Sequence, residues 1–405
     1  MQQAGEEQVL ADVEWSGRKP LTLHVWEALC VASMLFVWAC VPLLVVVVGP
    51  LLLLCPSTYW LVLPLLAWTF FDRHAGYTGG RRPLGLRGTR FARGILGYYP
   101  LRVVRAAGCE LDPRRNYILD AHPHGFMQLA TLGAVLLSEK VPAAFPGMTF
   151  RAAGASYLVH LPIVREVALS LGTISSSERS IRHALQHPGH GLALLVMSGA
   201  KEETLRLSDD SYNLYLKRRG FCRVALLEGA SLVPVLIFGK IHAYRQPFKN
   251  LSSWFHQKTG WRLVLPFGRG IFQPYLGPLP HRVPHTYVIG APLLVDRTEN
   301  PTKEQIEDLH ERYVEKLKQL YEEYSPKLHS GNVPLNKGSL LLSLCQKHSR
   351  VKRHSRKFCQ NVRTMPEFLI KIRALLKVVI LRTYFVIDCL SSTECQNKFS
   401  ALRGT

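Results

Sequence analysis

Residues 117–126 read YILDAHPHGF, a short apolar run that leads directly into two histidines, a proline and a glycine. The run predicts a β-strand, and the His-Pro-His-Gly string after it predicts a loop at the strand's end, where α/β proteins often carry reactive groups. A histidine titrates near neutral pH, so His122 or His124 can accept a proton from a hydroxyl. Pro123 stiffens the turn, and Gly125 allows close backbone approach, with following N–H groups that could steady an oxyanion. On these residues alone, the histidines could equally be metal ligands or satisfied polar side chains of a turn.

Short apolar runs of β type recur along the chain and alternate with amphipathic stretches, a pattern typical of a mixed α/β domain. The predicted strands are residues 117–119, 192–197, 232–238, 262–265 and 286–289. Apolar residues recur at helical spacing over residues 306–324, and Thr302 and Gln305 form a capping box before them. We expect an amphipathic helix there that packs on the sheet and carries no chemistry.

Residues 28–71 contain no Asp, Glu, Lys or Arg over 44 consecutive positions. A helix needs roughly 20 residues to cross the hydrocarbon layer of a bilayer, so this run is long enough for two crossings. Gly49, Pro50 and Pro56 mark the expected reversal. Because a polar leader precedes the run, we expect a retained anchor and not a cleaved signal peptide. The alternative is one tilted span followed by a buried apolar segment.

Basic residues flank this run on both sides and predict its orientation. Arg18 and Lys19 precede it, and several arginines between positions 73 and 93 follow it. Positively charged flanks favour the cytosol, so both ends of the run are expected there. The predicted organisation is a cytosolic leader at residues 1–23, a membrane hairpin at 24–71, a cytosolic α/β domain at 72–330 and a basic tail at 331–405.

The net charge of +21 is unevenly distributed along the chain. Residues 336–405 contain 14 Lys or Arg against 3 Asp or Glu, which places +11 of the charge in the tail. Such an excess suits an anionic membrane surface and a phosphate-bearing substrate. An apolar run at 368–390, broken by basic residues, predicts a helix in the membrane plane, with a poorly ordered extension as the alternative. No zinc finger or RNA-recognition motif is found, so we expect no nucleic-acid partner.

Nine cysteines are scattered along the chain. Their odd number and irregular spacing indicate a reduced compartment. Cys345, His348, His354 and Cys359 could be combined into a zinc site, but their spacing matches no standard pattern. We therefore expect no bound metal.

Several motifs follow one another along the chain. They are GGRR at 79–82, YYP at 98–100, HPHG at 122–125, Pro162 with Arg165 and Glu166, RRGF at 218–221, VPV at 233–235 with FG at 238–239, GRGIF at 268–272 and NPT at 300–302. By these motifs the sequence resembles the type-2 diacylglycerol acyltransferase family, which includes monoacylglycerol and wax-alcohol acyltransferases. The resemblance extends from the apolar run to about residue 325. It implies an α/β acyltransferase-like domain anchored by an N-terminal transmembrane helical hairpin.

The resemblance also implies roles for the two histidines. His124 is the expected general base, and His122 is its supporting partner or alternate. Related glycerolipid acyltransferases place an aspartate four residues after the histidine, but that spacing here gives Phe126 and Gln128. The acid that orients the imidazole is therefore expected elsewhere in the chain.

Glu202 is the expected orienting acid, because residues 198–202, SGAKE, are similar to the family's Gly-Gly-Ala-x-Glu element. Two residues depart from that pattern: Ser198 stands in place of a glycine, and Glu203 stands where a small residue is usual. A solvated surface acid is the competing interpretation of Glu202.

Four arginines are candidate contacts for the phosphates of acyl-CoA. Arg218, Arg219 and Arg269 lie beside glycines, which allow the backbone to approach a phosphate that the guanidinium binds bidentately. Arg165 is the fourth, with a structural ion pair to Glu166 as its alternative. For the other three, a solvated or structural charge competes with ligand contact. No cofactor is expected, because the acyl thioester arrives activated.

The resemblance implies an acyl-CoA-dependent O-acyltransferase that esterifies monoacylglycerol or diacylglycerol in triacylglycerol synthesis. The expected partners are acyl-CoA, a neutral lipid acceptor and the membrane, and a homo-oligomer is left open. We expect a multi-pass protein of the endoplasmic reticulum membrane with a cytosolic catalytic domain, and lipid droplets as a second location. A wax-alcohol acyltransferase and a non-catalytic lipid-binding scaffold are the alternatives. The missing histidine–aspartate spacing disfavours a lysophospholipid acyltransferase.

Overall fold

The computed structural model describes residues 7–13, 19–81, 85–125, 129–187, 191–205, 213–239, 243–245 and 267–328. All of these residues belong to one structural unit. The predicted strand at 262–265 and the predictions for the tail at 331–405 lie outside the described residues.

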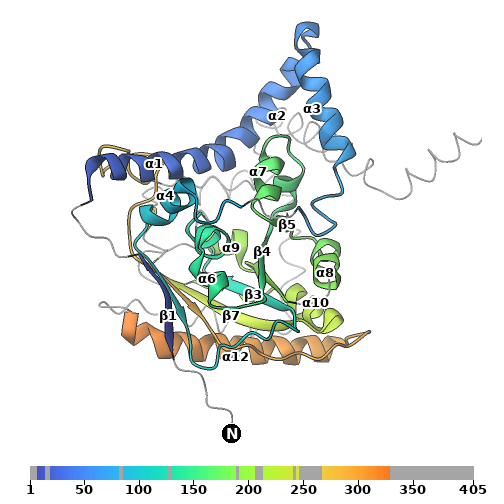
Figure 1. The fold of residues 1–405 in the computed structure, drawn as a ribbon. Helices are drawn as coiled ribbons and strands as arrows, with labels where there is room; N and C mark the ends of the chain where they lie inside the picture. Colours follow the sequence, from blue (N-terminus) through green and yellow to red (C-terminus); the bar gives the residue numbers. More distant parts are fainter. Residues whose placement is uncertain are drawn as a thin grey trace, which may run out of the picture. The chain divides into compact units, whose positions relative to one another are not determined.

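An eight-stranded mixed sheet forms the centre of this unit, in the order β1-β2-β8-β7-β3-β6-β4-β5 (Figure 1). The strands from β7 to β5 run parallel to one another, whereas β8 and β2 run in the opposite direction. The strands are β1 Gln8–Val13, β2 Leu101–Arg105, β3 Tyr117–His122, β4 Thr149–Gly154, β5 Thr173–Ser175, β6 Leu192–Val196, β7 Ser231–Phe238 and β8 His285–Ile289. The predicted mixed α/β domain is confirmed, and the predicted strands at 117–119, 192–197, 232–238 and 286–289 correspond to β3, β6, β7 and β8.

The three strands β3, β6 and β7 are buried along their whole length. A parallel strand covered on both faces needs apolar residues at successive positions, which explains why these strands are recognisable as continuous apolar runs. The side chains of one face pack against α8 Glu178–Gln186, α10 Gly220–Glu228 and α12 Lys303–Leu328. Those of the other face pack against α1 Leu21–Leu35, α4 Arg90–Tyr98 and α6 Lys140–Ala143.

The amphipathic helix predicted over 306–324 is confirmed as part of α12, which lies across one face of the sheet in Figure 1. The predicted capping box is also present: Thr302 N donates to Gln305 Oε1 at 2.9 Å, and Gln305 N donates to Thr302 Oγ1 at 3.3 Å. The buried side chains of α12 include Tyr313, Leu317 and Tyr324. The shorter helical segments are α5 Leu129–Leu132, η3 Gly133–Leu137, η4 Ser156–Val159, α7 Val164–Ser170 and α9 Ala200–Leu205.

The N-terminal apolar run forms α1, a π-helical turn at Phe36–Cys40, α2 Val41–Leu52, a 3₁₀ turn at Pro56–Thr58 and α3 Tyr59–Phe71. Within the described residues, one helix, Leu21–Leu52, is long and apolar enough to cross a membrane. The chain turns between α2 and the 3₁₀ turn, after Gly49 and Pro50, which lie inside α2. Its first part packs on the α/β domain, since Ala28 and Val31 are buried against α4. A second crossing through α3 stays a prediction.

Candidate active site

The end of β3 carries the candidate site. Asp120 and His122 are two residues apart on this strand, so their side chains point to the same face of the sheet. Both are completely buried, with 0% exposure. The chain then leaves the sheet and reaches His124 through Pro123, so the two predicted histidines lie in different surroundings.

His122 lies between two carboxylates. Its Nδ1 is 2.6 Å from Glu203 Oε1, and its Nε2 is 3.0 Å from Asp120 Oδ2. Burial alone would lower the pKa of His122, but the charges of Asp120 and Glu203 outweigh burial and hold that pKa well above its ordinary value. Both ring nitrogens therefore carry protons, and His122 is an imidazolium that donates two hydrogen bonds.

Asp120 accepts further hydrogen bonds from two other parts of the chain. Ser198 donates to it twice, from its backbone N to Oδ1 at 2.8 Å and from its Oγ to Oδ2 at 2.7 Å. Tyr313 of α12 donates from its hydroxyl to Oδ2 at 3.2 Å. Burial raises the pKa of Asp120, but the imidazolium of His122 and the Ser198 hydrogen bonds outweigh it, so the net shift is downward. Ser198, where the family has glycine, thus adds a hydroxyl donor to this buried charge cluster.

Glu203 joins the charge cluster to the HPHG turn. Its Oε2 accepts a hydrogen bond from the backbone N of His124 at 2.6 Å, and its Oε1 accepts another from the backbone N of Tyr215 at 3.0 Å. A Cβ at Gly199 would lie 2.0 Å from the Glu203 carboxyl carbon, so only glycine leaves room for this approach. The side chain of Glu203 is 0% exposed.

The carboxylate that contacts His122 is therefore Glu203, to which the sequence-based predictions assigned no role. Both residues lie on α9, and neighbouring residues of a helix point about 100° apart, so only one of them can face the sheet. Glu202 is half-buried. A role for Glu202 in orienting His124 stays a prediction.

His124 lies beyond the charge cluster, half-buried, with its ring at the wall of a cavity. Its Nδ1 is 2.9 Å from the backbone O of Gly125 and 3.1 Å from Thr204 Oγ1, and that hydroxyl also donates to the same carbonyl at 2.8 Å. A carbonyl oxygen only accepts hydrogen bonds, so Nδ1 carries the proton. The lone pair of the neutral ring is then on Nε2. Gly125, at φ +67°, makes the turn that brings its carbonyl to the ring.

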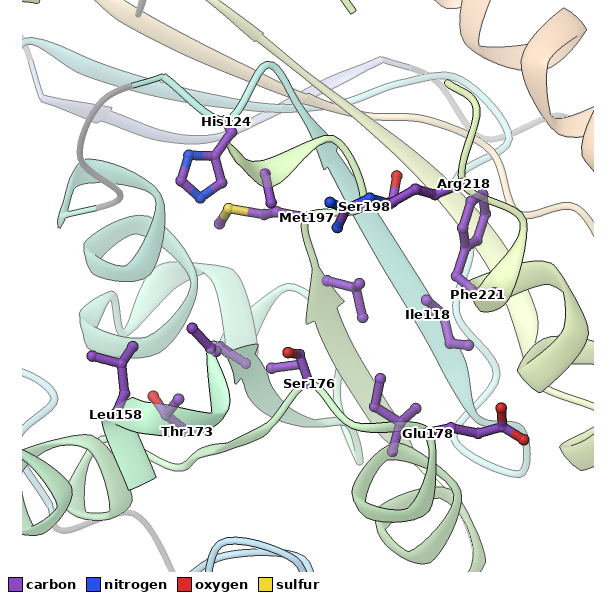
Figure 2. A pocket seen from close by; sticks show the side chains of 18 of the residues that line it. Ile118, His124, Leu158, Thr173, Ser176, Glu178, Met197, Ser198, Arg218 and Phe221 are labelled. Carbon is purple, nitrogen blue, oxygen red and sulfur yellow. The ribbon is translucent and has the colours of Figure 1, made fainter. Parts of the chain in front are cut away.

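The cavity beside His124 has a volume of about 750 Å³. Its wall is largely apolar and comes from the sheet and the helices above it, with contributions from Ile118, Leu158 and Met197 (Figure 2). Trp38, from the π-helical turn of the N-terminal helix, also lines it. His124 and Ser198 provide polar groups at the cavity wall. A mostly apolar cavity with a few polar groups is typical of a site for a lipid-like ligand.

Two of the four predicted arginines line this cavity. Arg218 and Arg219 come directly before α10, and both side chains are exposed. Arg219 forms an ion pair with Glu307 at the surface. Positive side chains at the start of a helix favour an anion, because the N-terminus of the helix adds a partial positive charge.

Arg269 lies elsewhere, on a loop between β7 and β8. Burial and the positive charges of Arg245 and Arg269 lower the pKa of His281 nearby. The part of the cavity wall that the structure describes does not include Arg269.

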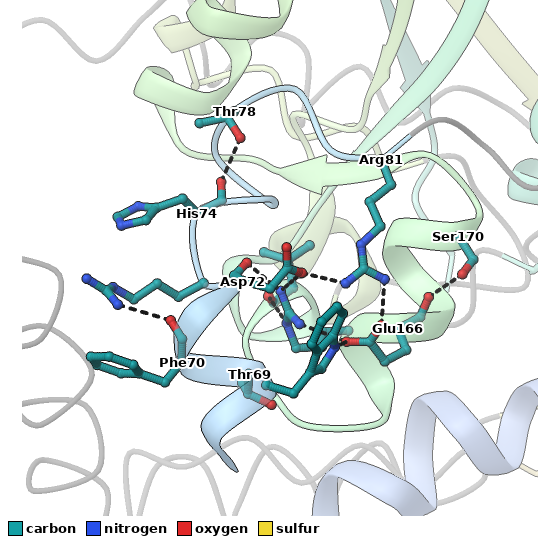
Figure 3. A network of polar contacts seen from close by, with 12 residues as sticks. Thr69, Phe70, Asp72, His74, Thr78, Arg81, Glu166 and Ser170 are labelled. Atoms are coloured by element: carbon teal, nitrogen blue, oxygen red, sulfur yellow. Dashed lines mark hydrogen bonds and ion pairs between the residues drawn. The ribbon is translucent and has the colours of Figure 1, made fainter. Parts of the chain in front are cut away.

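Arg165 is completely buried and also lies away from the cavity wall. Its guanidinium contacts Asp72 Oδ2 at 2.8 Å and Glu166 Oε1 at 2.7 Å, and Arg81 bridges the same two carboxylates (Figure 3). Trp68 Nε1 donates to Glu166 at 3.1 Å. These contacts tie the end of α3 to α7, which is the structural ion pair that the sequence left as the alternative.

Comparison with known proteins agrees with the geometry. The model of the diacylglycerol acyltransferase family matches residues 51–336. The 2-acylglycerol O-acyltransferase 1 of Bos taurus is 36% identical, over 70% of this chain and 87% of that protein. The acyl-CoA wax alcohol acyltransferase 2 of Mus musculus is 32% identical, over 72% of this chain and 91% of that protein. The diacylglycerol O-acyltransferase 2B of Umbelopsis ramanniana is 32% identical, over 66% of this chain and 80% of that protein.

A solved structure, the 1-acyl-sn-glycerophosphate acyltransferase of Thermotoga maritima, is 17% identical and covers 74% of this chain and 97% of its own. Its TM-score of 0.33 is too low for the two folds to be compared in detail. The family match spans more than two thirds of the sequence, and the relatives align over most of their own length. This chain therefore belongs to the diacylglycerol acyltransferase family.

Proposed function

We propose that this protein transfers an acyl group from acyl-CoA to the hydroxyl of a monoacylglycerol or diacylglycerol, as a step of triacylglycerol synthesis. The observation that carries the proposal is the position of His124, whose ring lines an apolar cavity of about 750 Å³ and whose Nδ1 is occupied by Gly125 and Thr204. The names of the relatives include acylglycerol and wax-alcohol acyltransferases. Both kinds of acceptor present a hydroxyl on a long apolar molecule.

In this proposal His124 acts as the general base. Its Nε2 takes the proton of the acceptor hydroxyl while the hydroxyl oxygen attacks the thioester carbonyl. A C–O bond forms, and the carbonyl oxygen becomes an oxyanion in a tetrahedral intermediate. The intermediate then collapses, the C–S bond breaks, and the CoA thiolate takes the proton from the imidazolium of His124. The backbone of the turn at Gly125 is the proposed site of oxyanion stabilisation, as Pro123 has no N–H.

His122 has a different proposed role, because both of its ring nitrogens donate to carboxylates. It holds the charge cluster together and does not exchange protons with the substrate. Glu203 links this cluster to the backbone of His124, so it is a positioning residue for the base. Glu202 stays a candidate for orienting the His124 ring, in place of the contacts that Gly125 and Thr204 make with Nδ1 in this structure.

Arg218 and Arg219 are the proposed contacts for the CoA phosphates, because they lie at the cavity and at the N-terminus of α10. The ion pair of Arg219 with Glu307 is exposed on both sides, so a phosphate can replace it at little cost. The described cavity wall includes neither Arg165 nor Arg269, and their contact with the CoA phosphates stays a prediction. No cofactor is included in the proposal, because the thioester supplies the activated acyl group.

The finer points of topology also belong to this proposal. We propose that residues 24–71 form a transmembrane hairpin, and that the α/β domain faces the cytosol, where acyl-CoA is available. The basic residues on both flanks of the run support this orientation. The endoplasmic reticulum membrane is the proposed location, with lipid droplets as a second one, and the neutral lipid acceptor would enter from the membrane.

The test uses the full chain and a His124→Gln variant, each expressed in membranes that lack their own neutral-lipid synthesis. Labelled oleoyl-CoA is supplied with monoacylglycerol, diacylglycerol and a fatty alcohol, and the lipid products are separated. Label in an acylglycerol product that is lost in the variant supports the proposal. Label only in a wax ester would move the acceptor to a fatty alcohol. Acyl-CoA binding without any transfer by the unmodified chain would leave a lipid-binding scaffold and contradict the proposed enzyme.

A further inference from the structure

Residues 267–279 form a loop that is ordered by its own hydrogen bonds. Its two arms pair through two isolated antiparallel β-bridges, Gly268 with Gly277 and Arg269 with Leu279. At the tip, the side-chain oxygen of Gln273 accepts hydrogen bonds from the backbone N of Tyr275 at 2.7 Å and of Leu276 at 2.9 Å. The shape of the tip is therefore maintained by backbone and amide contacts and does not depend on burial of its apolar side chains.

The apolar side chains of this tip point away from the protein. Phe272 is 81% exposed, Tyr275 is 85% exposed and Leu276 is 58% exposed. Because Gln273 fixes the backbone at Tyr275 and Leu276, the Cα–Cβ bonds of these two residues keep their outward direction. Two aromatic rings and a leucine held together in this way form an exposed apolar patch, which marks a contact surface.

The base of the loop is fastened to α1. Arg282 Nη1 is 2.6 Å from Glu27 Oε2, and Arg282 Nη2 donates to the backbone O of His24 at 3.0 Å. The Arg282 guanidinium also lies 4.3 Å from the centre of the Tyr98 ring. The side chains of Arg282 and Glu27 are only 5% and 3% exposed. The loop thus stands beside the N-terminal end of α1, where Figure 1 draws it in yellow-orange.

The outer face of α1 is apolar as well. Trp26 and Leu29 of α1 and Phe36 of the π-helical turn after it lie along one side of the helix and are 44%, 48% and 52% exposed. α1 is itself the first part of Leu21–Leu52, the helix that is long and apolar enough to cross a membrane. A lipid surface that covers α2 therefore continues along the outer face of α1 and reaches the loop.

We propose that Phe272, Tyr275 and Leu276 insert into the phospholipid bilayer beside α1 as a membrane contact separate from the crossing helix. A phenylalanine and a leucine suit the boundary of the hydrocarbon layer, and a tyrosine suits the headgroup level. Arg269, partly exposed on one arm of the loop, is placed to meet lipid phosphates. Insertion of the loop adds a point of attachment apart from the apolar helices and so restricts the orientation of the domain on the bilayer.

The test places the photoreactive residue p-benzoylphenylalanine at single positions of the full chain, reconstituted in phosphatidylcholine vesicles that carry a radiolabelled acyl chain. The two test positions are Phe272 and Tyr275. Val47 of α2, 53% exposed, is the positive control, and Glu322 on the exposed face of α12 is the negative control. After irradiation, the protein is separated from free lipid and its covalently bound label is counted.

We expect the protein to carry label from both loop positions at a level close to that at Val47 and well above that at Glu322. Label at Val47 with none above the Glu322 level at either loop position would overturn the proposal. A cross-link from Phe272 to a second copy of the chain would also overturn it, because the loop would then be a subunit contact. Since cross-linking needs no turnover, the result is independent of whether the protein transfers acyl groups.

Discussion

Replacing Glu203 with glutamine tests the charge cluster most directly. The carboxylate of Glu203 accepts three hydrogen bonds, from His122 Nδ1, from His124 N and from Tyr215 N. Glutamine offers one acceptor oxygen, so its NH₂ group would face at least one of these donors. The change also removes one of the two negative charges that surround the buried imidazolium.

The loss of folding stability in Glu203→Gln can be calculated from these contacts. Each hydrogen bond to a charged group contributes about 1.5–3 kcal/mol, and at least one of the three is lost. Removing one partner of a buried ion pair costs about 3–5 kcal/mol, which is the larger of the two effects. At about 2 °C per kcal/mol for a chain of this size, we expect Glu203→Gln to lower the Tm by roughly 6–10 °C.

The pH dependence gives a second measurement with a definite sign. The pKa of His122 is raised above its ordinary 6.5, so the stability that it contributes is complete below about pH 6.5 and is lost as pH rises through the folded-state pKa. The pKa of Asp120 is lowered from 3.8. The stability that Asp120 contributes is therefore complete above about pH 3.8 and is lost as the pH falls through the folded-state pKa. Without Glu203 the pKa of His122 falls, so the loss of Tm on the alkaline side should begin at a lower pH.

The assay is thermal unfolding of the purified full chain in detergent, followed by intrinsic fluorescence between pH 5 and pH 9, together with acyl transfer from labelled oleoyl-CoA. Because Glu203 positions the backbone of His124, transfer should fall by about 10²-fold. Glu202→Gln, one residue earlier and half-buried, is the matched control and should change Tm little. If Glu202→Gln lowers the Tm as much as Glu203→Gln does, the assignment of the buried carboxylate is refuted.

Three further predictions concern single side chains. Ser198→Gly removes the hydroxyl donor 2.7 Å from Asp120 and should lower stability by about 1.5–3 kcal/mol while transfer persists; an unchanged Tm would contradict the hydrogen bond. Trp38→Phe keeps an aromatic ring at the cavity but removes an indole N–H that is buried without a hydrogen-bond partner among the described residues. We expect a higher KM for the acyl acceptor and an unchanged KM for acyl-CoA, and the reverse pattern would show that this end of the cavity holds the acyl-CoA. Arg165→Met leaves two carboxylates of its network without their buried partner and should cost about 3–5 kcal/mol, whereas a raised KM for acyl-CoA at unchanged Tm would support its predicted ligand role.

The part of the fold nearest the site could be predicted from sequence because its physical causes are local. β3, β6 and β7 are buried on both faces and therefore appear as continuous apolar runs. α12 has both a periodic apolar face and a capping box. By contrast, β1, β2, β4 and β5 include polar positions, and their pairing with neighbouring strands is not a local property of the sequence.

The HPHG turn of the site could be predicted from the sequence, but the carboxylates that contact His122 could not. The predicted strand ended at Leu119, whereas β3 continues to His122, and this extension places Asp120 on the same face as the histidine. A longer predicted strand would have placed Asp120 and His122, two residues apart, on the same face of the sheet. Choosing between Glu202 and Glu203 requires the rotation of α9 about its axis, which depends on packing against the sheet.

The arginines show that sequence motifs do not predict contacts between residues far apart in the chain. Arg165 is adjacent to Glu166 in sequence, but its burial depends on Asp72, which lies 93 residues earlier in the chain. Arg269 lies between two glycines and Arg219 lies beside Gly220, yet the described cavity wall includes Arg219 and not Arg269. Motif spacing alone contains no information on either contact.

The hydrogen bond from Tyr313 to Asp120 also has a consequence for how the protein is made. A ribosome releases the chain from its N-terminus, so the apolar helix Leu21–Leu52 and β3 are complete long before α12 emerges. Until then Asp120 lacks the Tyr313 hydroxyl, and the face of β7 that α12 covers is open to water. The nascent protein thus acquires its finished charge cluster last. A message that stops before codon 303 would yield a product in which the carboxylate of Asp120 lacks the Tyr313 hydroxyl, and such a product is a natural substrate for protein quality control.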